Sequence, residues 1–329
     1  MVRNNFWSNQ RVFVTGATGL VGSNLVKKLL KMNAEVHAFI WETPRTSELV
    51  RSQNISQITL HYGNLSDKDT VENSIIKSNA EIIFHLGAKT IVSEALNNPE
   101  ETLLTNIQGT WNVLESVRNI GSKIKCVIVA SSDKAYGKPI HLPYSETHPL
   151  HGDAPYDVSK SCADLIAQSY AKTFGLPVGI SRCGNIYGPG DTNWSRIVPG
   201  TFKSLILEKS RPLIRSNGLY LRDYIFVEDV VDAYLTLAEQ YENLIPGSAF
   251  NFSHDRAYSV MEIYEQICLA ALGKVIEPEV QNIVVHEIEE QHLVSHKAMR
   301  ELGWKTHYEL KEGLDLSAKW YIEFFKSEK

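Results

Sequence analysis

The sequence has little cysteine, no long apolar run and no strong excess of charge of either sign. Its cysteines are far apart and contain no Cys-x-x-Cys pair, which argues against a disulfide framework and against a thiolate metal site. We expect reduced, buried thiols at Cys126, Cys162, Cys183 and Cys268.

Other absences exclude further classes of protein. The first ten residues lack the apolar stretch of a secretory signal, and no segment approaches the ~18 uninterrupted apolar residues of a membrane span. A formal net charge of -5 argues against a surface built for nucleic acid or anionic membrane. The close histidine pairs, His148 with His151 and His292 with His296, have no third ligand in register. These absences predict a cytoplasmic protein with no nucleic-acid, membrane or metal partner.

The 329 residues are enough for one large α/β unit, or for a core domain with a smaller second one. Short β-branched runs alternate with helical patterns, which is typical of right-handed βαβ units and predicts a doubly wound parallel sheet. The expected strands are 12–15, 34–40, 58–62, 81–86, 125–131 and 177–182, and the expected helices are 20–32, 100–118 and 156–174.

The regular alternation ends after Cys183. Glycine and proline interrupt 184–190 and 199–200, and shorter elements follow irregularly. A strand-like run at 249–252 is expected to return to the main sheet. We therefore predict a main domain over 1–183, rejoined by about 226–253, and a smaller, discontinuous substrate-binding domain mainly over 184–329.

Three glycines lie between the first expected strand and the first helix, in the spacing Gly-x-x-Gly-x-x-Gly. This is a variant of the Gly-x-Gly-x-x-Gly turn, in which the backbone approaches a pyrophosphate at a helix N-terminus. An ordinary strand-to-helix connection is the competing interpretation. The predicted dinucleotide contacts here are Gly16, Thr18, Gly19, Leu20, Val21 and Gly22.

The acidic residue that would bind an adenosine ribose is displaced in this sequence. Glu42 lies two residues later than the expected position, and Arg45 would instead suit a 2′-phosphate, so NAD is predicted with NADP left open. His85 is expected to pack rather than to act in catalysis. The ends of the third and fourth strands add the predicted cofactor contacts Asn64, Leu65, Leu86, Gly87, Ala88 and Lys89.

Tyr156 and Lys160 are four residues apart at the start of an expected helix, so their side chains share one face. A phenol has a pKa of about 10, and a nearby ammonium lowers it by stabilising the phenolate. Such a pair also occurs by chance on helix surfaces. Ser132, at the end of a preceding strand, favours a proton-transfer site in which Tyr156 is the base.

At this point the chain resembles the extended short-chain dehydrogenase/reductases, specifically the NAD-dependent nucleotide-sugar epimerases and dehydratases, over essentially its whole length. The matching motifs occur in family order: Gly16-x-x-Gly19-x-x-Gly22, His85-Leu86-Gly87-Ala88, Ser131-Ser132 before Tyr136-Gly137, Tyr156-x-x-x-Lys160, Gly184-Asn185-x-Tyr187-Gly188-Pro189 and Arg222-Asp223-Tyr224-x-x-Val227-x-Asp229. The resemblance implies a Rossmann-type sheet and a tightly held NAD. It also implies that Ser132 bonds the reacting hydroxyl, that Tyr156 is the redox base and that Lys160 orients the cofactor, with Ser131 beside it.

Asp133 and Lys134 distinguish two branches of this family. Simple epimerases generally carry small or uncharged residues here, whereas a 4,6-dehydratase needs two further proton-transfer groups. The Ser-Asp-Lys order resembles the CDP-glucose 4,6-dehydratases and implies that Asp133 is the general acid and Lys134 the candidate base. To act so, Asp133 must be protonated and Lys134 neutral. A water or Tyr156 is the alternative base, and a turn-capping Asp133 beside a solvated Lys134 is the structural alternative.

The leading hypothesis is a nucleotide-sugar 4,6-dehydratase that oxidises C4 transiently. A nucleotide-sugar 4-epimerase and a non-catalytic dinucleotide-binding regulator are the alternatives. The resemblance implies a nucleotide-diphosphate hexose substrate, held by Asn185, Arg196 and Arg222. It also implies a homodimer whose interface is built from the expected helices 100–118 and 156–174.

Overall fold

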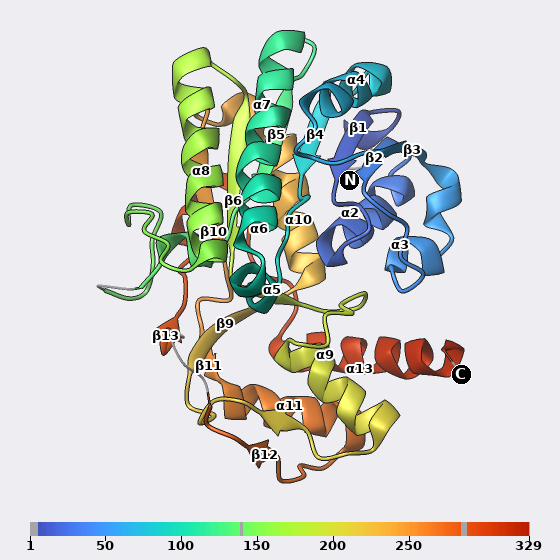
Figure 1. The fold of residues 1–329 in the computed structure, drawn as a ribbon, viewed down its shortest axis with the longest axis vertical. Helices are drawn as coiled ribbons and strands as arrows, with labels where there is room; N and C mark the ends of the chain where they lie inside the picture. Colours follow the sequence, from blue (N-terminus) through green and yellow to red (C-terminus); the bar gives the residue numbers. More distant parts are fainter. Residues whose placement is uncertain (1–5, 139–140, 284–287, 329) are drawn as a thin grey trace.

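Seven parallel strands form the central sheet of a larger lobe, in the order β10-β6-β5-β4-β1-β2-β3 (Figure 1). The computed structural model describes residues 6–138, 141–283 and 288–328. The strands of this sheet are β1 Arg11–Thr15, β2 Glu35–Ile40, β3 Thr59–Tyr62, β4 Ile82–His85, β5 Cys126–Ala130, β6 Val178–Cys183 and β10 Ser248–Phe252. The predicted α/β fold with a doubly wound parallel sheet is confirmed.

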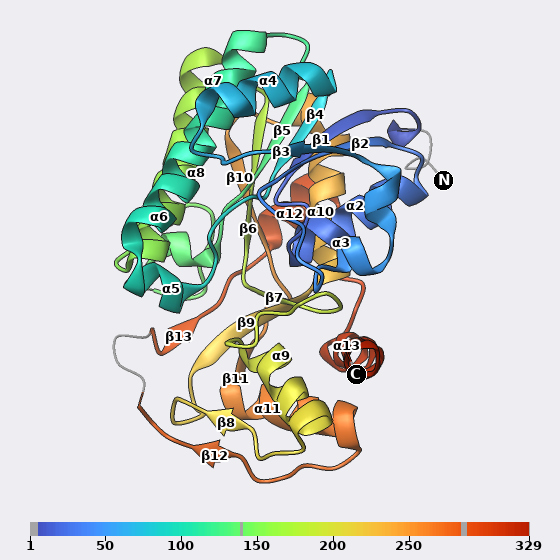
Figure 2. The same cartoon turned by 45° about the vertical axis from the view of Figure 1, so that its right-hand side comes forward.

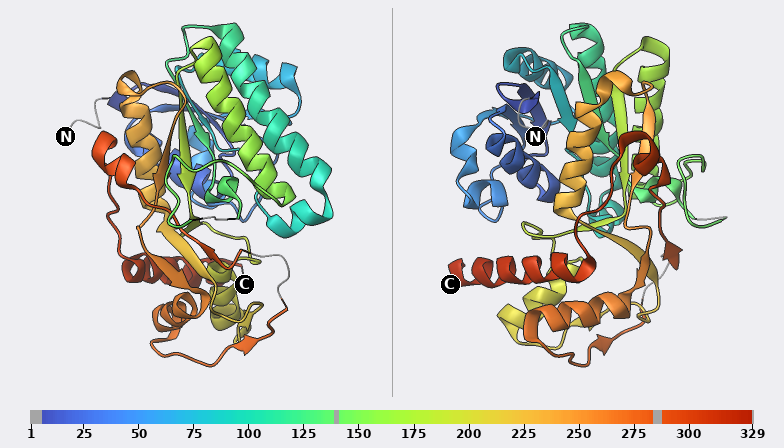
Figure 3. Two further views of the ribbon diagram at one scale, coloured as in Figure 1. Left: turned by 90° about the vertical axis from the view of Figure 1, so that its left-hand side faces the viewer. Right: turned by 180° about the vertical axis from the view of Figure 1, so that it is seen from behind.

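Helices cover both faces of this sheet, which explains why its central strands are apolar at almost every position. One face carries α4 Lys68–Ser78, α7 Gly109–Ile120 and α8 Pro155–Phe174, and the other carries α2 Leu20–Lys31 and α10 Val227–Glu239 (Figure 3). A buried apolar cluster fills the space on each side. Short helices α3 Glu48–Arg51 and α5 Val92–Asn97 lie at connections.

The strand order reverses beside β1. From β1 the chain proceeds to β2 and β3 on one side of the sheet, and then crosses to β4, β5 and β6 on the other. Ligands of open α/β sheets bind at such a switch point, outside the carboxyl ends of the strands. The glycine turn after β1 lies at this point.

The helix expected over 100–118 is not uniform. It consists of α6 Pro99–Leu103, a wider π-type turn over Leu104–Gln108, and α7. Turns of this type inside helices are frequent at functional sites. The turn contains Asn106, whose side chain bonds the backbone of Lys89 after β4.

A smaller lobe lies against one end of the main sheet, with α13 at its side (Figure 2). None of the helices within the described ranges is long and apolar enough to span a bilayer. The remaining elements are β7 Asn185–Tyr187, α9 Ile197–Phe202, β8 Leu213–Ile214, β9 Leu221–Phe226, β11 Ala257–Ser259, α11 Val260–Leu272, β12 Glu279–Val280, β13 Glu290–Gln291, α12 His296–Leu302 and α13 Leu310–Ser327.

The chain returns to the main lobe twice. Strand β10 pairs in parallel with β6, and Ala298, Leu302 and Trp304 in and after α12 join the apolar cluster beside α2 and α10. We propose a domain division at about residue 183, with 226–253 and also 296–304 belonging to the main domain. The second return was not predicted, because α12 is too short for a clear periodic pattern.

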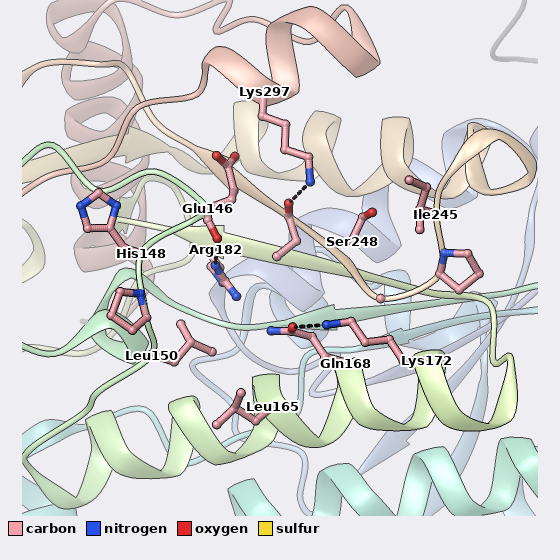
Figure 4. A pocket seen from close by; sticks show the side chains of 14 residues that line it. Glu146, His148, Leu150, Leu165, Gln168, Lys172, Arg182, Ile245, Ser248 and Lys297 are labelled. Carbon is pink, nitrogen blue, oxygen red and sulfur yellow. Dashed lines mark hydrogen bonds between the residues drawn. The ribbon is translucent and has the colours of Figure 1, made fainter.

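A buried ion pair joins α8 to β6. The Arg182 guanidinium donates to both carboxylate oxygens of Asp164, at 2.8 and 2.9 Å, and the side chains are 2% and 0% exposed. Arg182 also donates to the Tyr136 hydroxyl at 2.8 Å. Beyond it lies a cavity of about 390 Å³, on whose wall Lys297 donates to the carbonyl of Ala249 at 2.8 Å (Figure 4). The Arg182–Asp164 ion pair fixes the position of α8, the helix that carries Tyr156 and Lys160.

Candidate active site

The glycine turn after β1 contacts the end of β4. Gly16 has a φ of 70°, and a Cβ atom there would lie 2.7 Å from the backbone nitrogen of Gly87. Only glycine therefore allows both the conformation and the contact. Helix α2 begins at Leu20 with Gly19 as its N-cap and no acidic residue in its first turn. Its first N–H groups lack partners within the helix and suit a pyrophosphate.

The segment after β4 is fixed by buried hydrogen bonds. The hydroxyl of Thr15 accepts from the backbone of Leu86 at 3.1 Å and of Gly87 at 2.9 Å, and it bonds the His85 ring at 2.9 Å. Burial, with the charge of Lys160, lowers the pKa of His85 to about 3. His85 is therefore a neutral, structural residue, as expected.

Asn106, in the π-type turn, is a positioning residue that the sequence motifs did not single out. Its side chain accepts from the backbone nitrogen of Lys89 at 2.8 Å and donates to the carbonyl of Lys89 and to the Ser159 hydroxyl, both at 2.9 Å. It therefore ties the predicted cofactor segment to α8. The available signal was a buried asparagine inside an expected helix, where this residue type is unfavourable.

The structure brings Ser132, Tyr156 and Lys160 to the carboxyl end of β5. Pro155 occupies the first helical position of α8, where its missing N–H is tolerated. Tyr156 and Lys160 follow on one face, and both are buried. The Ser132 side chain, in the segment that directly follows β5, is near enough to Tyr156 to act to lower its pKa. The Ser131 hydroxyl is buried and has no partner among the described residues.

Burial, rather than the expected attraction between Tyr156 and Lys160, is the largest effect on the pKa values of both residues. It raises the pKa of Tyr156, as does the charge of Asp133, while the Ser132 side chain opposes them. Burial lowers the pKa of Lys160 to about 8, and its amine donates to the Ala130 carbonyl at 2.9 Å. Lys160 is not among the main effects on the Tyr156 pKa, so the expected lowering by Lys160 is not seen in this state.

The buried Asp133 and the half-buried Lys134 form a turn beside these residues. One carboxylate oxygen of Asp133 accepts from the Ser132 hydroxyl at 3.0 Å, and the other is buried without a partner in the described part of the chain. The Lys134 amine donates to the side-chain oxygen of Gln291. Ser132, not Asp133, caps the turn, because its hydroxyl accepts from the Lys134 backbone at 3.2 Å. Neither part of the structural alternative for this pair therefore applies.

Asp157 is a second carboxyl group at this site. Burial raises the pKa of Asp157 to about 6, Lys134 acts to lower it, and Asp133 acts to raise it. Asp157 was not predicted, although its position directly after Tyr156 places it in the first turn of α8. It is buried and contributes negative potential beside Lys134.

The predicted substrate residues lie in the smaller lobe or at its junction. Asn185 lies in β7, whose neighbour β9 carries Arg222. Arg222 is buried and donates to the carbonyls of Leu221 at 2.8 Å and Glu289 at 3.1 Å. Arg196 forms an ion pair with Asp191 at 2.8 Å. Their contact with a diphosphate stays a prediction.

All four cysteines are free thiols, and all except the half-buried Cys162 are buried. Within the described residues, no three histidine, cysteine, aspartate or glutamate side chains gather as a metal site would require.

Asp223 is a buried carboxyl group behind the Asp133 turn. One of its oxygens accepts from the Ser253 hydroxyl and from the backbone of Leu293, and the other has no partner among the described residues. Burial raises the pKa of Asp223 from 3.8 to about 7, against the effect of these bonds. Between those values the folded protein holds a proton that the unfolded chain releases, so this group makes stability fall as pH rises.

Asp223→Asn is expected to remove this dependence. The free energy of unfolding of the wild type, relative to that of the variant, should fall as pH rises from about 4 to about 7 and then level off. Urea unfolding at several pH values measures the difference. A difference that stays constant across this range would contradict the proposed protonation of Asp223.

Comparisons with known proteins agree with this geometry. The model of the GDP-mannose 4,6 dehydratase family matches residues 13–316. The chain is 30% identical to the CDP-glucose 4,6-dehydratase of Salmonella typhimurium, over 100% of this chain and 95% of that protein.

Solved structures show the same architecture. The UDP-glucose 4-epimerase of Thermotoga maritima, solved with UDP-glucose, is 26% identical with a TM-score of 0.85, covering 97% of this chain and 99% of that chain. The dTDP-glucose 4,6-dehydratase of Bacillus anthracis, solved in complex with NAD, is 26% identical with a TM-score of 0.83, covering 97% and 100%. The chain belongs to the GDP-mannose 4,6 dehydratase family, within the short-chain dehydrogenase/reductases.

Proposed function

We propose that this protein is an NAD-dependent nucleotide-sugar 4,6-dehydratase, which converts a nucleotide-diphosphate hexose to its 4-keto-6-deoxy derivative. The observation that carries the proposal is the turn that places the buried Asp133 and the half-buried Lys134 beside Ser132 and Tyr156. It supplies two proton-transfer groups beyond those that oxidation requires. The 30% identity to a CDP-glucose 4,6-dehydratase supports the same choice.

The residues at the switch point suit NAD. The Gly16 turn leaves room for close backbone approach, the start of α2 offers free N–H groups, and the buried Ser131 hydroxyl lacks a partner in the described chain. A related 4,6-dehydratase is solved with NAD. Bound NAD would supply a hydride acceptor for C4 and later return the hydride to C6.

In the oxidation step, Ser132 orients the C4 hydroxyl and the Tyr156 oxygen takes its proton as C4 loses hydride. The raised pKa of Tyr156 means that this oxygen needs additional positive charge to ionise. The Arg196 guanidinium acts in this direction, and we assign the further positive charge to the Lys160 ammonium, one helical turn away. Its pKa of about 8 leaves it mostly protonated at neutral pH.

Elimination follows from the acidity of C5 beside the new C4 ketone. The neutral Lys134 amine takes the C5 proton, a C5–C6 double bond forms, and the C6–oxygen bond breaks. Asp133 donates a proton to the departing hydroxyl, which leaves as water. When hydride returns to C6, C5 would take a proton back from the Lys134 ammonium, after exchange of that proton with solvent. The Asp133 oxygen that has no partner in the described chain is the site for that proton.

A 4-epimerase is the second candidate, because the chain shares its fold with a UDP-glucose 4-epimerase and both reactions begin at C4. The two outcomes differ at C5. Incubation with CDP-, UDP-, GDP- and dTDP-hexoses in heavy water is expected to give a product that has lost water and carries deuterium at C5. A C4-inverted product without deuterium would contradict the dehydratase proposal. If the protein binds a dinucleotide but converts none of these nucleotide sugars, the alternative of a non-catalytic dinucleotide-binding regulator would be favoured.

Asp133→Asn is the matched variant for this experiment. It keeps the shape of the side chain and removes the acid, so reduced nicotinamide should accumulate while elimination slows. Loss of both steps together would contradict the role assigned to Asp133.

We further propose a homodimer formed through α7 and α8. Each helix carries a large apolar side chain that is about half exposed in the single chain, Trp111 on α7 and Phe174 on α8. Exposed apolar side chains of this size are typical of a protein interface, and sedimentation velocity would detect a monomer that contradicts the proposal. The four free cysteines support a cytoplasmic location, which stays a proposal.

A further inference from the structure

We propose that Gln291 is a positioning residue for elimination: its neutral side chain holds the Lys134 amine in place without fixing the proton on it. This inference rests on the proposed dehydratase function and assigns a role to a residue outside the sequence motifs. It also explains how a lysine between carboxyl groups can serve as a base.

The Gln291 amide holds two parts of the same turn. Its oxygen accepts from the Lys134 amine, and its nitrogen donates to the carbonyl of Asp133 at 3.2 Å. The side chain is fully buried. Because both ends of the amide are engaged, Gln291 sets where the Lys134 amine lies relative to Asp133.

The segment that carries Gln291 is itself held on two sides. In β13, Gln291 is opposite Arg222 of β9. Next to it, the backbone of Tyr144 donates to the His292 carbonyl and accepts from Val294, both at 3.0 Å. The Leu293 backbone donates to Asp223 at 3.2 Å. The amide is therefore delivered by a rigid segment rather than by a free side chain.

The Gln291 side chain is uncharged, and this affects whether Lys134 can lose its proton and act as a base. A carboxylate at this position would attract the ammonium form of Lys134 and oppose its conversion to a base. An amide oxygen accepts a hydrogen bond from either the ammonium or the neutral amine. Asp157 already lies near enough to Lys134 for their charges to interact, and a carboxylate at position 291 would increase the bias toward the ammonium form.

Gln291→Glu tests the role of the uncharged side chain, because it adds a negative charge with almost no change in shape. We expect kcat for the dehydrated product to fall by about 10²–10⁴-fold, the range of general-base catalysis. Reduced nicotinamide should accumulate, because elimination becomes the slow step. The acidic limb of the kcat–pH profile should move to higher pH, an effect that a purely structural role would not produce.

Gln291→Met is the companion variant, since it removes the amide without adding charge. Deuterium incorporation at C5 should slow, while the acidic limb stays where it is in the wild type. Thermal unfolding shows whether Gln291→Glu folds. If it does not, the Gln291→Met variant still tests the positioning role. Wild-type exchange at C5 in the Met variant would contradict the positioning role.

Failure of this inference is distinguishable from failure of the proposed function. If the wild type gives a C4-inverted product, the dehydratase proposal fails, whatever the variants do. If the wild type dehydrates and Gln291→Glu does so at the same rate with the same pH profile, the role of Gln291 is wrong and the function stands.

Discussion

Tyr156→Phe is expected to lower kcat by about 10²–10⁴-fold and to abolish the rapid reduction of bound nicotinamide when substrate is added. The substitution removes only the oxygen that takes the C4 proton. The aromatic ring keeps its buried position at the start of α8, so the fold should be retained. Single-turnover absorbance of reduced nicotinamide, with kcat in the steady state, measures the effect.

Tyr170→Phe is the matched control for this experiment. Tyr170 lies on the same helix, and its hydroxyl donates to Glu115 at 3.1 Å, away from the Ser132 site. The same chemical change there should leave hydride transfer at the wild-type rate. If Tyr156→Phe retained kcat within tenfold of the wild type, Tyr156 would not be the redox base.

Asp164→Ala is expected to lower the free energy of unfolding by about 3–5 kcal/mol, the usual effect of removing one partner of a buried ion pair. The variant leaves the Arg182 guanidinium without its carboxylate at a position that is 2% exposed. The adjacent cavity offers water a route toward Arg182, so the lower end of that range is the expected value (Figure 4). Denaturant unfolding measures the change.

Asp315→Ala provides the comparison at the surface. Its pair with Lys311 has an N–O distance of 2.8 Å, as in the buried pair, but the side chains are 42% and 80% exposed. Exposed pairs contribute about 0–1 kcal/mol, so the free energy of unfolding should change little. If Asp164→Ala and Asp315→Ala lowered the free energy of unfolding equally, the Arg182 site would be accessible to water. Replacing both Asp164 and Arg182 with leucine and methionine should recover part of the loss.

Local patterns account for the features that were predicted correctly. The strands of the main sheet are short apolar runs, and the Gly16 turn has a spacing that its backbone conformation requires, so each could be recognised within a few neighbouring residues. Tyr156 and Lys160 share a helix, which made their proximity predictable.

The features that were missed depend on contacts between distant parts of the chain. Gln291 is 157 residues from Lys134 in sequence, and no spacing rule connects them. The π-type turn at Leu104–Gln108 contains Asn106, whose bonds to Lys89 join segments that are 17 residues apart. The pKa of Tyr156 depends on burial by the folded chain, which the pairing with Lys160 alone did not include.

Because β13 pairs with β9, the residues for elimination and those for oxidation are held by different parts of the fold. Ser132, Tyr156 and Lys160 belong to the large sheet and its helix α8, whereas Gln291 is attached to the strand that carries Arg222. A shift of that strand would displace the Lys134 amine and leave the oxidation residues in place. A substitution that loosens the β13–β9 pairing is therefore expected to slow the release of water more than the oxidation at C4.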